Sequence, residues 1–545
     1  MLLKQLNLAQ MQHVVLLDSL LLIHLINSRL GGNVVNYKSK RDKAQGKFDP
    51  KKRSNKSHNR SKIRTTEDKS GLPISNDPNW YFTNSIMAEQ ISSFSFNQFL
   101  GVPFTLGNNV PSEVKFGTIA TVWLNPSAGW TTINAPNVAG INMNGTKTFS
   151  QLSARNSKTT SYAPQDVTCL ILALGSVIEY VEWLRRAFGL AFTYNVRNRA
   201  YVKQVIECMG INFNDFISNL ADYRNKLNTV INMINQVPFP SNITYFDKCR
   251  SLYQDVYLDS MVSMAQSYIA NPWSLWTIDE QYDENGTGLT TTSIFSAVGG
   301  TTMGAHIDQL YSMIQALLTS TTLNYIYSDV LAYADKKSVT MLRLDMIASD
   351  YSVMPKYSEN ALLQLKNATV VGEPLPTNVQ YADGLHVTGS NDVKSNAELN
   401  CIMYTPQFKY GNPVMGIDSI LNFKSDTPDV TSRIEASRYT VRAEATLVEG
   451  QYFTSAITLP DHYVVKMMFF TTESTAPFTL NSSGQTLETA TYALLSRFGD
   501  MPYIYRFNSG TFHSVYGDVD YFTTIDMQYL QAINDMCFMG MFELR

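Results

Sequence analysis

The chain has 545 residues, which is too long for one ordinary hydrophobic core and predicts two or three packed lobes. Charged residues make up 16% of the composition, against a typical value of about 25%, while hydrophobic residues at 44% suffice for a sizeable interior. The surface is therefore polar but weakly charged and rich in Tyr, Phe and Met. This composition suits extensive protein–protein contact, and it equally fits an enzyme with a neutral surface.

Residues 1–37 predict an apolar N-terminal helix that ends at Gly31-Gly32. Its apolar run, Val14 to Ile26, is about 13 residues, short of the roughly 20 needed to span a bilayer. Asp18 and His24 interrupt the run, and no small-x-small cleavage motif follows it. We therefore expect a helix that docks on the protein or contacts a membrane transiently, in preference to a signal peptide.

Residues 38–76 predict a disordered basic arm, because large apolar residues are too few there to offset the entropy of ordering. The candidate nucleic-acid-binding residues are its twelve cations, Lys38, Lys40, Arg41, Lys43, Lys47, Lys51, Lys52, Arg53, Lys56, Arg60, Lys62 and Arg64. With the acids Asp42 and Asp49, residues 38–64 carry +10. Residues 1–37 add +1 and the whole chain is −3, so residues 65–545 carry −14.

Such an arm neutralises phosphates without recognising bases, and its affinity comes from counterion release. Its single aromatic residue, Phe48, offers little base stacking, so no preference for unpaired bases is expected. A nuclear localisation signal or a solvated linker is the alternative. Twelve cations exceed what an import signal needs, which favours nucleic-acid binding.

Residues 77–355 predict a helix-rich lobe. Residues 165–192 form a strongly apolar segment whose polar stripe is Glu179, Glu182, Arg185 and Arg186. The clearest amphipathic pattern covers 213–236, where apolar residues recur every three or four positions until Pro238. Further helices are expected at 198–209, 255–269, 305–319, 325–334 and 524–542, and a strand within 112–124.

Residues 356–515 predict a β-richer region, with short β-branched and aromatic runs such as Val441–Val448 and Tyr463–Thr472. Residues 516–545 predict a C-terminal helix that returns to the helix-rich lobe. The fold class expected is therefore α+β and mainly α-helical, preceded by the disordered basic arm.

The histidines, cysteines and glycine motifs of the sequence do not predict catalysis. The histidines outside the arm, His306, His386, His462 and His513, are isolated and are expected to be packed or surface residues. Neither HExxH, a nucleophile elbow, nor a Walker or Rossmann glycine pattern occurs, and Gly299-Gly300 predicts a turn. The five cysteines, Cys169, Cys208, Cys249, Cys401 and Cys537, lie far apart without a CxxC pair, which argues against a disulfide scaffold or structural zinc and fits a reducing compartment.

Two separated acidic clusters are the strongest sign of an enzyme. Asp345 and Asp350, with Asp518 and Asp520, could hold two magnesium ions as in template-directed polymerases. The second cluster lacks adjacent aspartates, however, and an acidic body would repel a nucleic-acid template. We therefore predict no enzymatic activity, no cofactor and no metal site.

The layout of the chain resembles the capsid protein of picobirnaviruses, which have segmented double-stranded RNA genomes. An apolar N-terminus and a Lys/Arg/Ser/Asn arm precede the entry Pro78-Asn79-Trp80-Tyr81 and a Tyr/Asn/Thr-rich, helix-led body. The resemblance covers the whole chain and rests on layout and composition. It implies a shell domain at 77–355, a smaller β-containing protruding region at 356–515, and intertwined dimers, about 60 of which close an icosahedral shell.

The resemblance also implies the partners: other copies of the chain, viral double-stranded RNA and a viral polymerase inside the particle. The expected location is the virion, assembled in the host cytoplasm. Members of the family can lose an N-terminal peptide by self-cleavage, but the sequence identifies no scissile bond. Two alternatives stay open, a non-capsid RNA-binding accessory protein that stays small in solution and an enzyme on an unfamiliar fold.

Overall fold

The computed structural model divides the chain into two compact units, Met1–Phe96 and Asn97–Arg545. In the first unit the structure describes residues 84–86 and 89–90. In the second it describes 103–104, 114–115, 119–131, 136–156, 160–193, 199–258, 267–283, 286–374, 394–396, 399–409, 420–422, 429–448, 451–456, 458–470, 485–487, 504–508, 511–516 and 522–544. The predicted apolar helix 1–37 and the basic arm 38–76 both lie outside the described residues.

Helix α5 (Pro164–Phe192) is the centre of the second unit, and it confirms the helix predicted at 165–192. Pro164 occupies the first turn, where its missing N–H costs nothing, and the Asp166 carboxylate accepts a hydrogen bond of 2.8 Å from the Ala163 N–H. Among the described residues, α5 is the one helix long and apolar enough to cross a membrane. Its apolar stretch is completely buried in the protein, as in the core helix of a globular protein.

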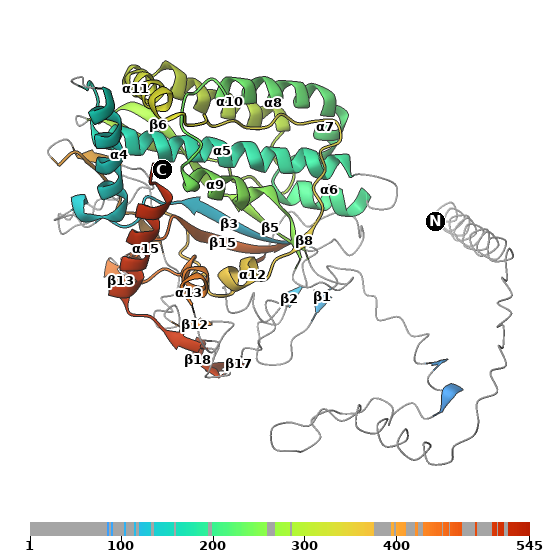
Figure 1. The fold of residues 1–545 in the computed structure, drawn as a ribbon. Coiled ribbons are helices and arrows are strands. Elements are labelled where there is room, and N and C mark those ends of the chain that lie inside the picture. Colours follow the sequence, from blue (N-terminus) through green and yellow to red (C-terminus); the bar gives the residue numbers. More distant parts are fainter. Residues whose placement is uncertain are drawn as a thin grey trace, which may run out of the picture. The chain divides into compact units, whose positions relative to one another are not determined.

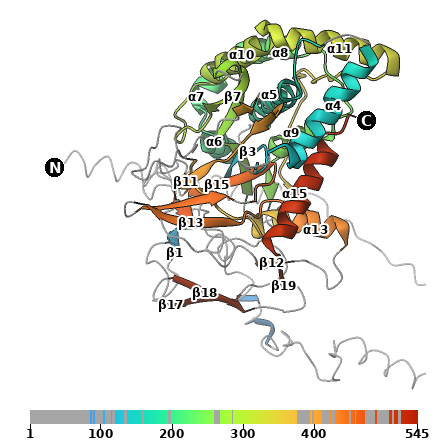
Figure 2. The same cartoon turned by 90° about the vertical axis from the view of Figure 1, so that its left-hand side faces the viewer.

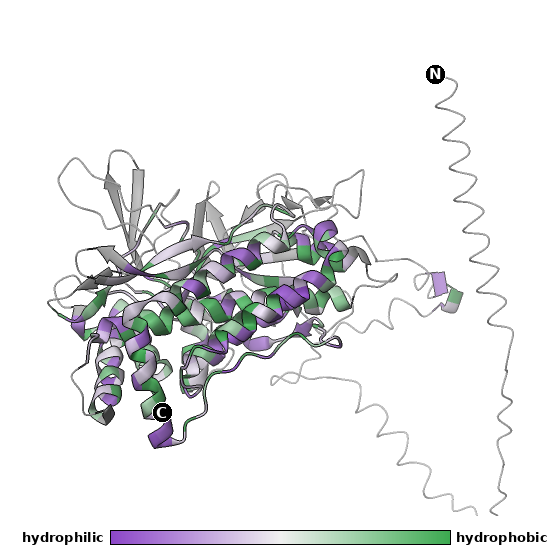
Figure 3. Cartoon of the chain, turned by 90° about the horizontal axis from the view of Figure 1, so that it is seen from above, coloured by the Kyte–Doolittle hydropathy of each residue, from purple (hydrophilic) through white to green (hydrophobic). Residues whose placement is uncertain are grey.

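Other helices pack around α5. Helices α4 (Gly140–Asn156), α9 (Thr244–Gln254), α10 (Met303–Thr319) and α11 (Thr321–Lys337) all pack against it. Figure 1 shows α8 and α10 above α5 and the sheet below it, and Figure 2 shows the same layers from the side. Seen from above in Figure 3, the outer helices carry hydrophilic residues beside hydrophobic ones, as expected for helices with one buried face.

The amphipathic segment predicted at 213–236 is two helices, α7 (Phe213–Ser218) and α8 (Leu220–Ile234). The break has a local cause, because polar side chains bond back to the preceding turn. The Ser218 hydroxyl donates to the Asn214 carbonyl at 2.7 Å, and the Asn219 amide donates to the Asp215 carbonyl at 3.0 Å. Such bonds compete with the regular helical ladder.

The largest sheet among the described residues has six strands in the order β16-β15-β3-β5-β4-β8. Its central strand β3 (Ile119–Pro126) pairs in parallel with β5 (Ser267–Pro272) and antiparallel with β15 (His462–Phe470). The chain between β3 and β5 includes α5 and α9, which provide the long connection that a parallel pair requires. The edge strands are β16 (Gln485–Leu487) and β8 (Lys356–Tyr357), and β4 (Tyr257–Leu258) lies between β5 and β8.

The helix predicted at 255–269 is wrong where the structure describes it. Tyr257–Leu258 and Ser267–Pro272 are strands β4 and β5, and they pair with each other. Strand β5 also pairs with β3 and β4 with β8, both distant in sequence, so tertiary contacts override the local helical pattern. A hairpin of β6 (Ser274–Asp283) and β7 (Gly286–Ser293), which the sequence analysis did not predict, follows directly.

The other predicted helices are present with small shifts of their ends. Residues 198–209, 305–319 and 325–334 correspond to α6 (Arg199–Cys208), α10 and α11, and 524–542 to α15 (Met527–Met541). The Thr302 hydroxyl caps α10, and the Gly299-Gly300 turn predicted before it is present. Shorter helices are η3 (Pro136–Val138), α12 (Glu359–Lys366) and α13 (Val430–Ser437).

Short β-elements surround this framework. They are β1 (Pro103–Phe104), β2 (Val114–Lys115), β9 (Lys394–Asn396), β10 (Cys401–Met403), β11 (Gln407–Lys409), β12 (Ile420–Asn422), β13 (Ala443–Val448), β14 (Gln451–Ala456), β17 (Ile504–Asn508), β18 (Thr511–Tyr516) and β19 (Phe522–Thr524). A continuous core runs from Val122 to Leu544 and includes Tyr404 and Tyr463. The mixture of helices and sheets confirms the α+β class, while the boundaries at 355 and 515 stay predictions.

Candidate functional site

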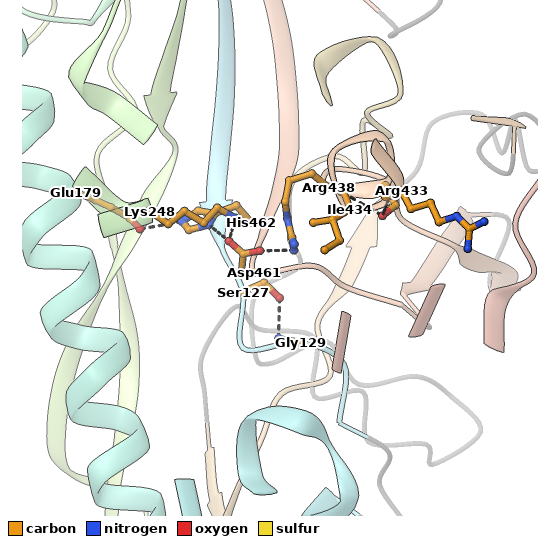
Figure 4. A network of polar contacts seen from close by, with 10 residues as sticks. Ser127, Gly129, Glu179, Lys248, Arg433, Ile434, Arg438, Asp461 and His462 are labelled. Atoms are coloured by element: carbon orange, nitrogen blue, oxygen red, sulfur yellow. Dashed lines mark hydrogen bonds and ion pairs between the residues drawn. The ribbon is translucent and has the colours of Figure 1, made fainter. Parts of the chain in front are cut away.

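The most unusual site among the described residues is a buried ionic network around Asp461. This carboxylate lies just before β15 and is completely buried. It forms ion pairs with Lys248 of α9 and with Arg438, the residue after α13. Its backbone carbonyl accepts a hydrogen bond of 2.7 Å from the Ser127 N–H, which follows β3. Four elements distant in sequence therefore meet at one residue (Figure 4).

His462, the next residue, joins this network to the central helix. Its Nε2 lies 2.8 Å from Glu179 Oε1 in α5, and its Nδ1 lies 2.8 Å from Asp461 Oδ2. All three side chains are fully buried. A neutral imidazole has one N–H, so making both contacts hydrogen bonds requires a second proton on the ring or on a carboxyl group.

Local structure explains how the two cations reach the carboxylate. The Asp429 side chain accepts a hydrogen bond of 2.8 Å from the Ser432 N–H and so starts α13. That helix ends at Ser437, which leaves Arg438 at its C-terminal end pointing at Asp461 in Figure 4. Lys248 projects from α9, a helix packed directly against α5.

The charges in the network nearly cancel. With a neutral imidazole, Lys248 and Arg438 balance Asp461 and Glu179, so protonation of His462 leaves an uncompensated positive charge in the interior. Burial lowers the pKa of His462 below its ordinary value, and the Glu179 carboxylate opposes this shift. Burial and the adjacent Arg438 also lower the pKa of Lys248, whereas contact with the Asp461 carboxylate favours its charged form.

A nucleophilic role for the neighbouring thiol is not supported. Cys249 of α9 hydrogen-bonds Glu179, and both Cys249 and Tyr245 are completely buried. Burial raises the pKa of the Cys249 thiol well above its ordinary value, so it is protonated and unreactive. All five cysteines lie in described residues and are free thiols.

A groove lies beside the network, between the sheet and helices α9, α12, α13 and α15. Its volume is about 1280 Å³. Val122 and Leu124 of β3 form part of its wall, and Lys248 and Arg438 of the ionic network also line it. The groove lining is otherwise largely apolar, with Leu252, Leu365, Leu421, Ile434, Ile525, Ile533 and Met541.

The predicted site residues are not brought together by the described part of the chain. All twelve cations of the arm, and also Asp518 and Asp520, lie outside it. Asp345 and Asp350 are exposed on an irregular segment. Within the described ranges no three His, Cys, Asp or Glu side chains gather as metal ligands.

The histidines behave partly as predicted. His306 is a packed core residue, as expected: its Nδ1 lies 2.9 Å from the Tyr180 hydroxyl and its ring contacts Trp183. His462 is also buried, but its two carboxylate partners were not foreseen. The available signal was weak: a single Glu179 within an apolar helix, and Asp461-His462 before a β-branched run. His386 lies outside the described residues.

Comparison with known proteins assigns the family. The family model described as "Picobirnavirus, Capsid protein" matches residues 80–527. The chain belongs to the picobirnavirus capsid protein family. The capsid protein precursor of Human picobirnavirus is 21% identical to this capsid protein over 388 residues, covering 67% of this chain and 68% of the relative.

A solved structure supports the fold. The crystal structure of the picobirnavirus capsid superposes with a TM-score of 0.68 at 15% sequence identity, covering 86% of this chain and 98% of that chain. As a viral capsid protein, the chain is a component of the virion with a structural role. In such a protein the buried network is best understood as part of the scaffold rather than as an active site.

Loss of the Asp461 charge should be strongly destabilising. In Asp461→Asn, Lys248 and Arg438 lose their common counterion, and we expect the free energy of unfolding to fall by about 3–5 kcal/mol. Glu543→Gln is the matched control, because its ion pair with Lys147 is exposed and should contribute less than about 1 kcal/mol. Denaturant unfolding of the purified proteins measures the free energy of unfolding of each variant. Equal losses in the two variants would contradict the inference that the buried Asp461 ion pairs matter more than an exposed one.

His462 should make the protein sensitive to acid. Its pKa in the folded protein is lowered, so the unfolded chain binds the proton first, and stability is lost as the pH falls below about 6.5. One such group contributes at most about 1.4 kcal/mol per pH unit. We expect His462→Gln, which cannot be protonated, to lose less stability than the wild type between pH 7 and pH 5. A variant that is more acid-labile would show that the native ring is charged.

Proposed function

We propose that this capsid protein assembles as dimers into a closed icosahedral shell around a double-stranded RNA genome, with residues 38–64 contacting the RNA without sequence specificity. The separation of charge along the chain is the observation that supports this proposal. Residues 38–64 carry +10, whereas residues 65–545 carry −14. A polyanion is therefore attracted to one segment only.

The number of charges suits genome packaging. A shell of about 120 copies would hold on the order of 1,200 positive charges from these arms, each charge able to neutralise a phosphate. A segment predicted to be disordered can reach phosphates on duplexes in any orientation. Because its cations are interspersed with Ser, Asn and Gly, base-specific contacts are not expected.

The acidic body has a complementary role in this proposal. Wherever its inner face is negative, it repels RNA, so packed duplexes can slide past a viral polymerase inside the particle. We place assembly in the host cytoplasm, where free cysteines persist. Residues 1–37 are the segment we expect to contact membranes transiently, and the name "precursor" of the human virus relative is compatible with removal of an N-terminal peptide.

Exposed apolar side chains of the body support self-assembly. Tyr311, Tyr325, Leu331, Met354 and Met536 are each at least 38% exposed, although charged residues are scarce in the chain. Side chains of these types are enriched at protein interfaces. A non-capsid accessory protein that stays small in solution, the alternative considered from the sequence, does not need such a surface. Membership of a capsid protein family also argues against that alternative.

Neutralising the arm should abolish packaging. We expect a variant with all twelve cations of residues 38–64 changed to Gln to form particles that retain little nuclease-protected RNA, because counterion release no longer drives binding. The control keeps the composition of these 27 residues but scrambles their order, and it should package RNA like the wild type. Undiminished RNA in the Gln variant would refute the role of the arm.

Binding should also depend steeply on salt. If six to ten phosphates are contacted, affinity of the unassembled protein for double-stranded RNA should fall roughly 10³–10⁵-fold between 50 and 200 mM salt. Changing about half of the cations to Gln should halve the slope of log affinity against log salt concentration. Fluorescence anisotropy with a labelled duplex measures this slope, and a slope independent of the cations would locate binding elsewhere.

A further inference from the structure

Exposed apolar side chains gather along one groove of the second unit. Val430 of α13 is 74% exposed, and Tyr529 and Met536 of α15 are 67% and 63% exposed. All three line the groove beside the ionic network. A soluble protein rarely leaves such side chains together in water, and a patch of this kind marks a binding surface.

The shape of the groove favours a protein occupant. Its volume, about 1280 Å³, exceeds the roughly 300–1,000 Å³ of small-molecule sites. Small residues on three of its walls leave this space open, among them Ala270, Ala361 and Gly540. A Cβ at Gly540 would meet no heavy atom of the described residues within 4 Å, so none of these residues packs against the helix there.

The charges of the groove suit a surface that pairs with itself. Arg433 and Glu435 of α13 both line it, so the same patch carries both signs. Lys248 and Arg438 also line it, but the carboxylates of Asp461 and Glu179 in the ionic network balance their charges. Little net charge is left to attract RNA or another polyanion. Two identical patches related by a two-fold axis can instead place Arg433 of each copy near Glu435 of the other.

We propose that a second copy of this chain covers this groove, in a two-fold contact formed by α13 and α15. The proposal rests on the proposed function, since it assigns a surface to the dimer from which the shell is built. The apolar side chains of α15 provide its centre and the charged residues of α13 its rim, which is the usual anatomy of a protein interface. The ionic network holds α13 against the core and so fixes the shape of the surface.

Two methionines on one helix allow a matched test. Met536 lines the groove, whereas Met539, which is 42% exposed on the same helix, does not. We expect Met536→Glu and Gly540→Glu to weaken dimerisation by about tenfold or more, because each buries a charge in the interface. Met539→Glu should dimerise like the wild type. Circular dichroism verifies folding, and light scattering after size-exclusion chromatography measures the dimer over a dilution series.

Cross-linking identifies the occupant directly. Full-length protein with Met536→benzoylphenylalanine is prepared in ¹⁴N and ¹⁵N forms, mixed, allowed to assemble and irradiated. Cross-linked peptides of mixed isotope content are expected, since the partner is another copy. Cross-links confined to one isotope, or a small molecule retained by the wild type in native mass spectrometry, would overturn the proposal.

The outcomes separate the two proposals. If the wild type assembles and Met536→Glu assembles equally well, the groove is not the contact surface and the proposed shell function is unaffected. If the wild type forms neither dimers nor particles under any condition that keeps it folded, the proposed function itself fails.

Discussion

The Asp461 carboxylate is the contact on which the rest of the second unit depends. It lies in the interior between Lys248 and Arg438, and the adjacent His462 extends the contact to Glu179 in the central helix. Ion pairs of this kind add little net stability over apolar packing, but removing one member leaves the others as unpaired charges in a medium of low polarity. Helices α9 and α13 and strand β15 are therefore held in one relative position, because displacing any of them would leave buried charges unpaired.

This arrangement distinguishes a scaffold from a catalytic centre. Acids, a histidine, a thiol and two cations lie together, which is the set of groups found in many active sites. Here the carboxylates and the imidazole are completely buried, and the thiol has a pKa raised by burial. Substrate cannot reach such groups, and their polar atoms are used to orient elements instead. Membership of the capsid protein family independently favours a structural role for the network.

Local sequence patterns predicted the elements better than their contacts. The apolar run of α5 and the spacing of apolar residues in α8 identify both helices without any knowledge of the fold. The break at Asn219 was missed because it depends on side chains that bond to the backbone. The strands β4 and β5 within 255–272 were missed because they also pair with β8 and β3, which are distant in sequence. The buried ionic network could not be predicted either, because its members are distant in sequence. His462 and Glu179 are 283 positions apart, and no spacing rule connects them.

The position of β15 in the sheet has a consequence for synthesis of the protein. Strand β3 appears early during translation, but its antiparallel partner β15 starts only at His462 and helix α15 ends at Met541. Contacts between such distant segments form slowly and only after both have left the ribosome. A nascent chain therefore carries an open sheet edge and no finished wall around the groove. If a second copy covers the groove as proposed, a polypeptide that is still being translated lacks the surface that this contact needs.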